Sequence, residues 1–213
     1  MRIFLASDVH GSRKALAELP ARALRQNADI VVLAGDISHR GKPHGYIQEL
    51  VRAFGGRPVL AVPGNLDPHE VHGDFALAGA ISIHEGRIVI GGTGFSGMGG
   101  STPHIFGGPY QVEEKKIELG LRLAEPGDVL VLHCPPRGTL DRTRIGLRAG
   151  SRAAAAAVER LRPKLVLCGH VHEARGVVSR GETLYVNAGP GKNLCSALIM
   201  GDGHTRFRAE LHG

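Results

Sequence analysis

Five short apolar runs in this chain each lead directly into residues that can bind a metal ion. The runs are rich in Val, Ile and Leu and are apolar throughout, which is typical of strands buried on both faces of a sheet. In open α/β sheets, ligands bind beyond the carboxyl ends of the strands, so the following side chains are expected to gather at one sheet edge. They are Asp8 and His10 after 3–6, Asp36 after 30–33, Asn65 after 59–62, His133 after 129–132, and His170 and His172 after 165–168.

The first third of the chain alternates strand and helix patterns. Strands are expected over 2–7, 30–34 and 59–62. One helix is expected from a cap at Ser12 to an interruption near Pro20, and a second over 46–54. This β-α-β-α-β order predicts parallel strands joined by right-handed crossovers.

The rest of the chain predicts further α/β structure and a second sheet packed on the first. The expected elements are a hairpin of 81–84 with 87–90, a glycine-rich loop over 91–108, a helix over 113–124, a strand over 129–133, a long loop over 135–150, a helix over 152–161, and strands over 165–168, 175–179, 183–187, 195–199 and 205–211. No repeat or linker divides the pattern, so residues 1–213 are expected to form a single domain.

Composition narrows the function classes. No apolar run approaches the roughly 18–20 residues of a membrane span, and no leader pattern precedes the first strand, so a cytoplasmic location is expected. The net charge of +6 favours anionic partners such as phosphate esters. The basic residues are scattered and aromatic residues are few, so nucleic acid is possible as a partner but not favoured. The sequence leaves the oligomeric state open.

The residue types at the strand ends suit transition metals. Mixed imidazole and carboxylate ligands fit these metals better than calcium. The ligand types permit manganese, iron, zinc and nickel, of which manganese is the first expectation. Any one of these residues could instead be a helix cap, a turn residue or a core histidine, so only the whole set together indicates a metal site. Seven candidate ligands exceed the needs of one tetrahedral zinc, which favours two divalent cations. Asp8 with His10, and His170 with His172, are two residues apart and would face the same way in extended segments.

In order along the chain, Asp8-x-His10, Gly35-Asp36, Gly64-Asn65, His133 and Gly169-His170-x-His172 resemble the motifs of the calcineurin-like metallophosphoesterase superfamily. The chain looks like the small prokaryotic phosphodiesterases of this group. The resemblance implies an α/β fold, a four-layer α/β/β/α sandwich of two mixed sheets flanked by helices. It also implies that Asp8, His10 and His172 hold one metal, that Asn65, His133 and His170 hold the other, and that Asp36 bridges them.

One position departs from the pattern of the superfamily. Many members have a histidine after the asparagine, held by the next acidic residue, to assist the leaving group. Here Leu66 and Asp67 follow Asn65, and leucine cannot donate a proton. His39 is the replacement donor to test and Arg40 a candidate phosphate contact, although the simpler interpretation of both, as solvated loop residues, is favoured.

These observations predict a dimetal-dependent phosphoesterase, with phosphodiesters favoured over phosphomonoesters as substrates. A metal-bridging hydroxide would attack phosphorus in line, with Asp36, Asn65 and His133 acting through the metals and Asn65 also touching the phosphate. A protein-binding scaffold of the same fold with an idle metal site is the first alternative. A metal-dependent nuclease is the second.

Overall fold

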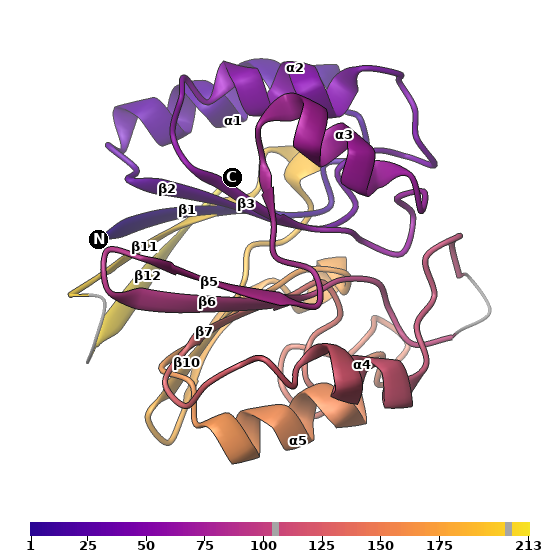
Figure 1. The fold of residues 1–213 in the computed structure, drawn as a ribbon, viewed down its shortest axis with the longest axis vertical. Helices are drawn as coiled ribbons and strands as arrows, with labels where there is room; N and C mark the ends of the chain where they lie inside the picture. The colour runs from indigo at the N-terminus through magenta and orange to yellow at the C-terminus, as the bar shows by residue number, and fades with distance from the viewer. Residues whose placement is uncertain (104–106, 203–205) are drawn as a thin grey trace.

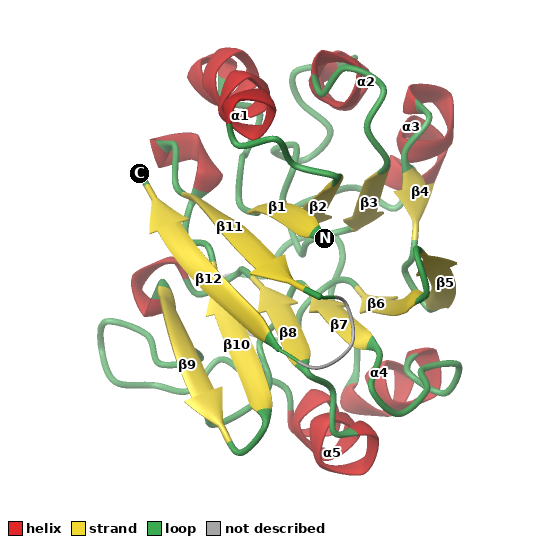
Figure 2. Ribbon diagram, turned by 90° about the vertical axis from the view of Figure 1, so that its left-hand side faces the viewer, coloured by secondary structure: helices red, strands yellow, loops and turns green. Residues whose placement is uncertain are grey.

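Two six-stranded sheets lie face to face in the computed structural model, with helices on both outer faces (Figures 1 and 2). The structure describes residues 1–103, 107–202 and 206–213. The first sheet is covered by α1 (Arg13–Arg25), α2 (Tyr46–Ala53) and α3 (Val71–Ala78), and the second by α4 (Glu114–Gly120) and α5 (Arg152–Leu161). This arrangement confirms the four-layer sandwich. None of the described helices is long and apolar enough to cross a membrane.

The first sheet has the order β12-β11-β1-β2-β3-β4. Its strands are β1 (Arg2–Ala6), β2 (Ile30–Ala34), β3 (Val59–Val62), β4 (Ile81–Ser82), β11 (Ser196–Gly201) and β12 (Phe207–His212). The strands β1 to β4 pair in parallel, whereas β11 joins β1 and β12 joins β11 in antiparallel pairs. The sheet is therefore mixed, as expected.

The second sheet has the order β5-β6-β7-β8-β10-β9. Its strands are β5 (Gly86–Ile90), β6 (Thr93–Met98), β7 (Val129–Leu132), β8 (Leu165–Cys168), β9 (Gly176–Arg180) and β10 (Thr183–Asn187). The central strands β6, β7, β8 and β10 are parallel, and the two edge strands are antiparallel to their neighbours. This sheet is also mixed.

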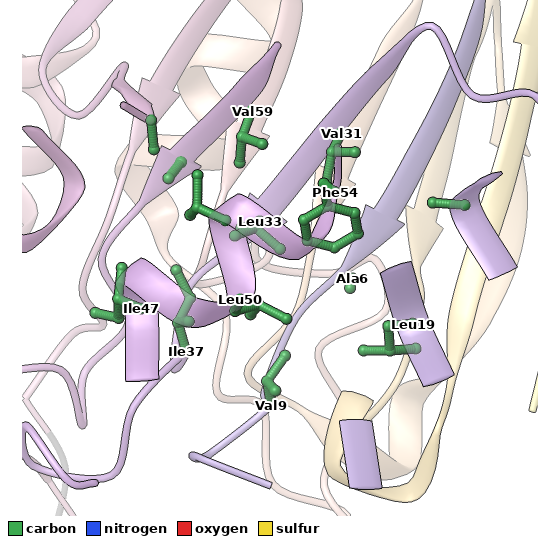
Figure 3. Close-up of a cluster of buried hydrophobic side chains, with 14 of the residues drawn as sticks. Ala6, Val9, Leu19, Val31, Leu33, Ile37, Ile47, Leu50, Phe54 and Val59 are labelled. Carbon is green, nitrogen blue, oxygen red and sulfur yellow. The ribbon is translucent and has the colours of Figure 1, made fainter. Parts of the chain in front are cut away.

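Alternating side chains of each central strand enter different apolar layers. In β1, Ile3 and Leu5 face the layer between the two sheets, whereas Phe4 and Ala6 face the helices. The ring of Phe4 lies 6.1 Å from the ring of Phe54, and Figure 3 shows part of this helix-facing cluster. Burial on both faces explains why these strands read as unbroken apolar runs.

The predicted hairpin of 81–84 with 87–90 is wrong. The strand β4 pairs with β3 in the first sheet, whereas β5 pairs with β6 in the second. The strand β6 lies within the segment expected to be a loop, and residues 104–106 of that segment lie outside the described residues. Within this strand, position 97 requires glycine, because a Cβ there would come within 2.8 Å of Val62 in the facing sheet. A glycine that signals a loop in the sequence thus serves close packing between sheets.

Two further expectations about secondary structure need correction. Helix α1 continues through the buried Pro20, because its apolar face packs on the sheet and compensates for the missing backbone hydrogen bond. Helix α3 is an additional element that the sequence reading missed, because it is short and has no clear apolar face. Helix α5 and strands β8 and β10 match their expected bounds, whereas residue 205 of the last expected strand lies outside the described residues.

Candidate metal centre

The seven ligand-type side chains come together where five strands end, but these strands belong to two sheets. Strands β1, β2 and β3 of the first sheet lead to Asp8, Asp36 and Asn65. Strands β7 and β8 of the second sheet lead to His133, His170 and His172. The expectation of a single sheet edge was therefore wrong, and the centre lies between the sheets.

Asp8, His10 and His172 form the first set of potential ligands, with atoms that all lie within 4.8 Å of one another. Asp8 Oδ2 is held in place by two donors, the Ser7 hydroxyl at 2.5 Å and the His170 backbone N–H at 3.0 Å. The other carboxylate oxygen, Oδ1, therefore remains to face the histidines. This set matches the three ligands that the resemblance implies for one metal.

Asp8, Asp36 and His133 form the second set, again with ligand atoms within 4.8 Å of one another. All three side chains are almost fully buried, with 1%, 3% and 0% of their surface exposed. Asp36 Oδ1 accepts a hydrogen bond from the Leu66 backbone N–H at 2.7 Å. Because Asp8 belongs to both sets, two cations at this centre would lie close together.

His133 is oriented by a hydrogen bond that crosses between the sheets. Its Nδ1 lies 2.8 Å from the carbonyl oxygen of Ala34 at the end of β2, an acceptor to which a neutral ring donates. On the other side of the ring, Nε2 lies 2.9 Å from Asn65 Oδ1 and 3.7 Å from Asp36 Oδ1. A backbone partner on one ring nitrogen and oxygen atoms beside the other is a common arrangement for a metal-binding histidine.

The backbone at the centre is not extended, contrary to expectation. Asp8, His10, Asp36 and His170 have φ angles of 54°, 49°, 50° and 66°, in the left-handed region. His172 begins a short 3₁₀ helix. The paired residues therefore meet through tight turns, not through the alternation of a strand. Such backbone strain in ordinary residues is concentrated at functional sites.

Glycines bring the backbone into close contact with the candidate ligands. A Cβ at Gly64 would overlap the Asp36 carboxylate. A Cβ at Gly169 would lie 2.5 Å from Asp8 Oδ2. Neither glycine has a positive φ angle, so space and not backbone conformation requires glycine at these two positions.

Buried acidic groups dominate the electrostatics. Burial raises the pKa of Asp36 to about 7, with Asp8 and Asp67 adding repulsion and His133 opposing it. Burial also disfavours the charged form of Asp8, but the adjacent His172 and His133 hold its pKa well below the ordinary range. A bound cation would favour the ionised form of both carboxylates, because the attraction offsets the cost of burying their charge.

The pKa values of the two histidines of the first set shift in opposite directions. Burial lowers the pKa of His10 to about 4, although the Asp8 carboxylate opposes this effect. His10 is therefore neutral at neutral pH, which is the form that binds metals. The Asp8 carboxylate raises the pKa of His172, so a proton and a cation compete for this ring.

Two buried atoms of the first set support the binding of a metal. Asp8 Oδ1 and His10 Nδ1 are buried and have no hydrogen-bond partner in the part of the chain that the structure describes. Asp8 Oδ1 lies 3.2 Å from His172 Nε2, which is an ion-pair distance when that ring is protonated. Buried polar atoms are nearly always satisfied. A divalent transition-metal ion would satisfy this oxygen and suits its imidazole neighbours.

A cavity of about 260 Å³ opens over the centre and is lined by His10, Asp36, His39, Asn65, Leu66, His170, His172 and Lys192. The ring of His39 lies 6.0 Å from that of His10, so His39 reaches the cavity. Arg40 is exposed and is not part of this lining, and its backbone N–H donates to Leu66. His170 belongs to neither close set of ligand atoms, but its ring lies 5.1 Å from that of His133.

Lys192 is a cavity residue that the sequence reading missed. It follows the turn Gly189-Pro190-Gly191, and its backbone N–H donates to the Asp8 carbonyl oxygen at 3.1 Å. Its position beside this strand end could have been found only from the pairing of β1 with the C-terminal segment. An ammonium group at the cavity is suited to contact an anionic substrate.

Asp67 links two of the ligand-bearing loops. Its carboxylate is fully buried and accepts hydrogen bonds from the backbone of Ile37 and Ser38, the Ser38 hydroxyl, and the Gly64 backbone. Burial raises its pKa in spite of these donors. In the absence of the histidine that it would hold in many family members, Asp67 fixes the loop after Asp36 to the loop before Asn65.

Comparison with known proteins defines the class. The family model for calcineurin-like phosphoesterases matches residues 1–174. The chain belongs to this family of metal-dependent phosphoester hydrolases.

Individual relatives extend the comparison over almost the whole chain. Uncharacterized protein MJ1162 of Methanocaldococcus jannaschii is 30% identical over 203 residues, which cover 89% of this chain and 88% of the relative. The crystal structure of TT1561 of Thermus thermophilus has a TM-score of 0.72 at 18% identity and covers 98% of this chain and 97% of that one. A structure described as a novel archaeal phosphodiesterase has a TM-score of 0.55 at 14% identity, with full coverage of both chains. These structural likenesses concern the fold alone.

Proposed function

We propose that this protein is a dimetal-dependent phosphodiesterase. The observation that carries the proposal is the sharing of Asp8 between two sets of buried ligand atoms, one with His10 and His172 and one with Asp36 and His133. Two ligand sets that share one carboxylate suit two neighbouring cations better than one. The expected roles of Asn65 and His170 at the second cation, and of Asp36 as the bridge, remain part of the proposal.

Two bound divalent cations would activate water and neutralise the charge that develops on the phosphoryl oxygens during in-line displacement. The protein's own groups hold and orient the reactants. His133 is held by Ala34, and Asp36 by the Leu66 backbone, so both keep one fixed arrangement at the centre, where Asp36 also lines the cavity. Lys192 supplies positive charge at the rim, where it would attract the substrate phosphate.

The preference for diesters rests on Leu66. This half-buried side chain lines the cavity at the position where many family members have a histidine. Leucine offers no proton to a leaving group but provides apolar contact for a second ester substituent, which a monoester lacks. The exposed His39, from the loop after β2, also lines this cavity and is the proton donor to test.

The test combines metal analysis with hydrolysis of bis(4-nitrophenyl) phosphate and 4-nitrophenyl phosphate in the presence of Mn²⁺. We expect two bound cations per chain and faster hydrolysis of the diester. Asp36→Ala and His133→Ala should each lower turnover by at least about 100-fold, since loss of even an outer partner of a ligand costs about 10–100-fold. His44→Ala is the matched control, because this exposed histidine lies outside the cavity lining.

Three contrary results would each have a different meaning. Equal turnover in the wild type and both ligand variants would reject the mechanism. A protein that binds no metal would favour the scaffold alternative. Cleavage of DNA or RNA with binding that weakens steeply in salt would favour the nuclease. A cytoplasmic location remains a prediction from the sequence.

A further inference from the structure

A second, larger cavity adjoins the metal centre. Its volume is about 660 Å³, within the range of pockets that hold small organic ligands. We call it the arginine groove. Its lining includes Arg137, Arg144, Ile145, Leu147, Arg148 and Arg152. His170 also lines the cavity over the metal centre, so the two cavities lie next to each other.

The groove carries an excess of positive charge. Its lining contains four arginines and two glutamates. Glu114 accepts hydrogen bonds from the Ser151 hydroxyl and from backbone N–H groups at the start of α5. Glu173 accepts one from the Arg144 backbone at 2.6 Å. Both acids are therefore engaged by groups of the protein itself.

The four arginines of the groove differ in their partners. Arg144 lies near Glu173 and Arg152 near Glu114, where each arginine helps to lower the pKa of the acid. Arg148 is paired with the buried Asp141 at 2.7 Å. The exposed side chain of Arg137 makes no ion pair with any acid among residues 1–103, 107–202 and 206–213. A guanidinium group in this state is suited to bind a phosphate with two parallel hydrogen bonds.

Apolar side chains lie beside these cations. Ile145 and Leu147 are 78% and 63% exposed, although both are large and apolar. They project from the loop between β7 and α5, which Thr143 and Asp141 hold in shape. Thr143 bonds to the Leu147 carbonyl through both its backbone and its hydroxyl, and Asp141 accepts from the Gly138 backbone at 2.8 Å. A loop ordered in advance loses little entropy on binding.

We infer that the arginine groove binds one ester arm of the phosphodiester substrate, a nucleoside that carries a second phosphate. This inference rests on the proposed function. With the scissile phosphate at the metal centre, His170 marks the direction in which the arm continues. Arg137 would hold the second phosphate, and Ile145 and Leu147 would contact the sugar and base. Planar guanidinium groups also stack well on flat rings.

The test uses three diesters with the same 4-nitrophenolate leaving group. They are thymidine 3′-phosphate 5′-(4-nitrophenyl phosphate), thymidine 5′-(4-nitrophenyl phosphate) and methyl 4-nitrophenyl phosphate. We expect kcat/KM to fall in this order. Arg137→Ala should lower it about ten-fold more for the first substrate than for the third, as expected for loss of a charged hydrogen-bond pair. Arg142→Ala is the matched control, because this exposed arginine of the same loop lies outside the lining.

Binding to the metal-free protein separates failure of this inference from failure of the proposed function. Calorimetry should show tighter binding of thymidine 3′,5′-bisphosphate than of thymidine 5′-phosphate, and Arg137→Ala should abolish the difference. If no diester is hydrolysed with Mn²⁺ but this binding pattern holds, the proposed function fails and the groove assignment stands. If diesters are hydrolysed and Arg137→Ala affects all three substrates equally, the groove assignment is overturned.

Discussion

The substitution Gly169→Ala tests whether the close approach of the backbone positions a metal ligand. The new Cβ would lie 2.5 Å from Asp8 Oδ2, whereas ordinary van der Waals contact begins at 3.4 Å. The carboxylate or the turn must therefore move by about 0.9 Å, the difference between these distances. Distances from ligands to metals tolerate only about 0.2 Å of variation. We expect the affinity for Mn²⁺ to fall by about 10–100-fold, as for other changes that displace a ligand.

The assay is a calorimetric titration of the metal-free protein with Mn²⁺, alongside urea unfolding of the same samples. Overpacking should lower the free energy of unfolding by about 1–3 kcal/mol. The control is Gly73→Ala in α3, where a Cβ would meet nothing within 4 Å. Alanine should leave metal affinity unchanged there and raise stability by about 0.4–1 kcal/mol. Folded Gly169→Ala protein with wild-type Mn²⁺ affinity would refute the reasoning.

Three further predictions concern stability. Arg87, Ser96 and a backbone N–H lower the pKa of the buried Asp128 in spite of desolvation, so its ionised form stabilises the fold above about pH 4 and this contribution is lost at lower pH. Asp128→Asn should therefore cost about 2–3 kcal/mol at pH 7 and less at pH 3, as measured by urea unfolding. Asp67→Ala leaves buried donors of two loops unpaired and should cost about 2–4 kcal/mol and weaken Mn²⁺ binding, so unchanged values of both would contradict its linking role. Chelation of the metals should lower the melting temperature, since a ligand at 100 times its Kd stabilises by about 2.7 kcal/mol, and an equal melting temperature with and without chelator would argue against metal binding.

The sequence predicted the strands that carry the candidate ligands because their burial on both faces leaves a local signal. Strand β8 and helix α5 match their expected bounds, and Ser151 caps the helix as its position suggested. The same apolar runs led to Asp36 and His133, which the structure brings together. Local composition was sufficient for these elements.

The features that the sequence did not predict depend on contacts between distant segments. Strand β6 contains Gly94 and Gly97, which indicate a loop when the sequence is considered alone. Their close contacts with other segments appear only in the folded protein. Lys192 reaches the cavity because its backbone bonds to Asp8. The link that Asp67 makes between two loops also exists only once β2 and β3 are paired. No window of neighbouring residues contains such information.

His133 donates across the space between the sheets to Ala34, so the candidate ligand atoms keep their spacing only while the two sheets keep their alignment. A slide of one sheet past the other by a few tenths of an ångström would alter every ligand distance that joins them. Substitutions in the apolar layer between the sheets, such as those at Val62 or Leu167, can therefore change metal selectivity without contacting the metal site. Evolution of a different metal preference would require no change in any ligand.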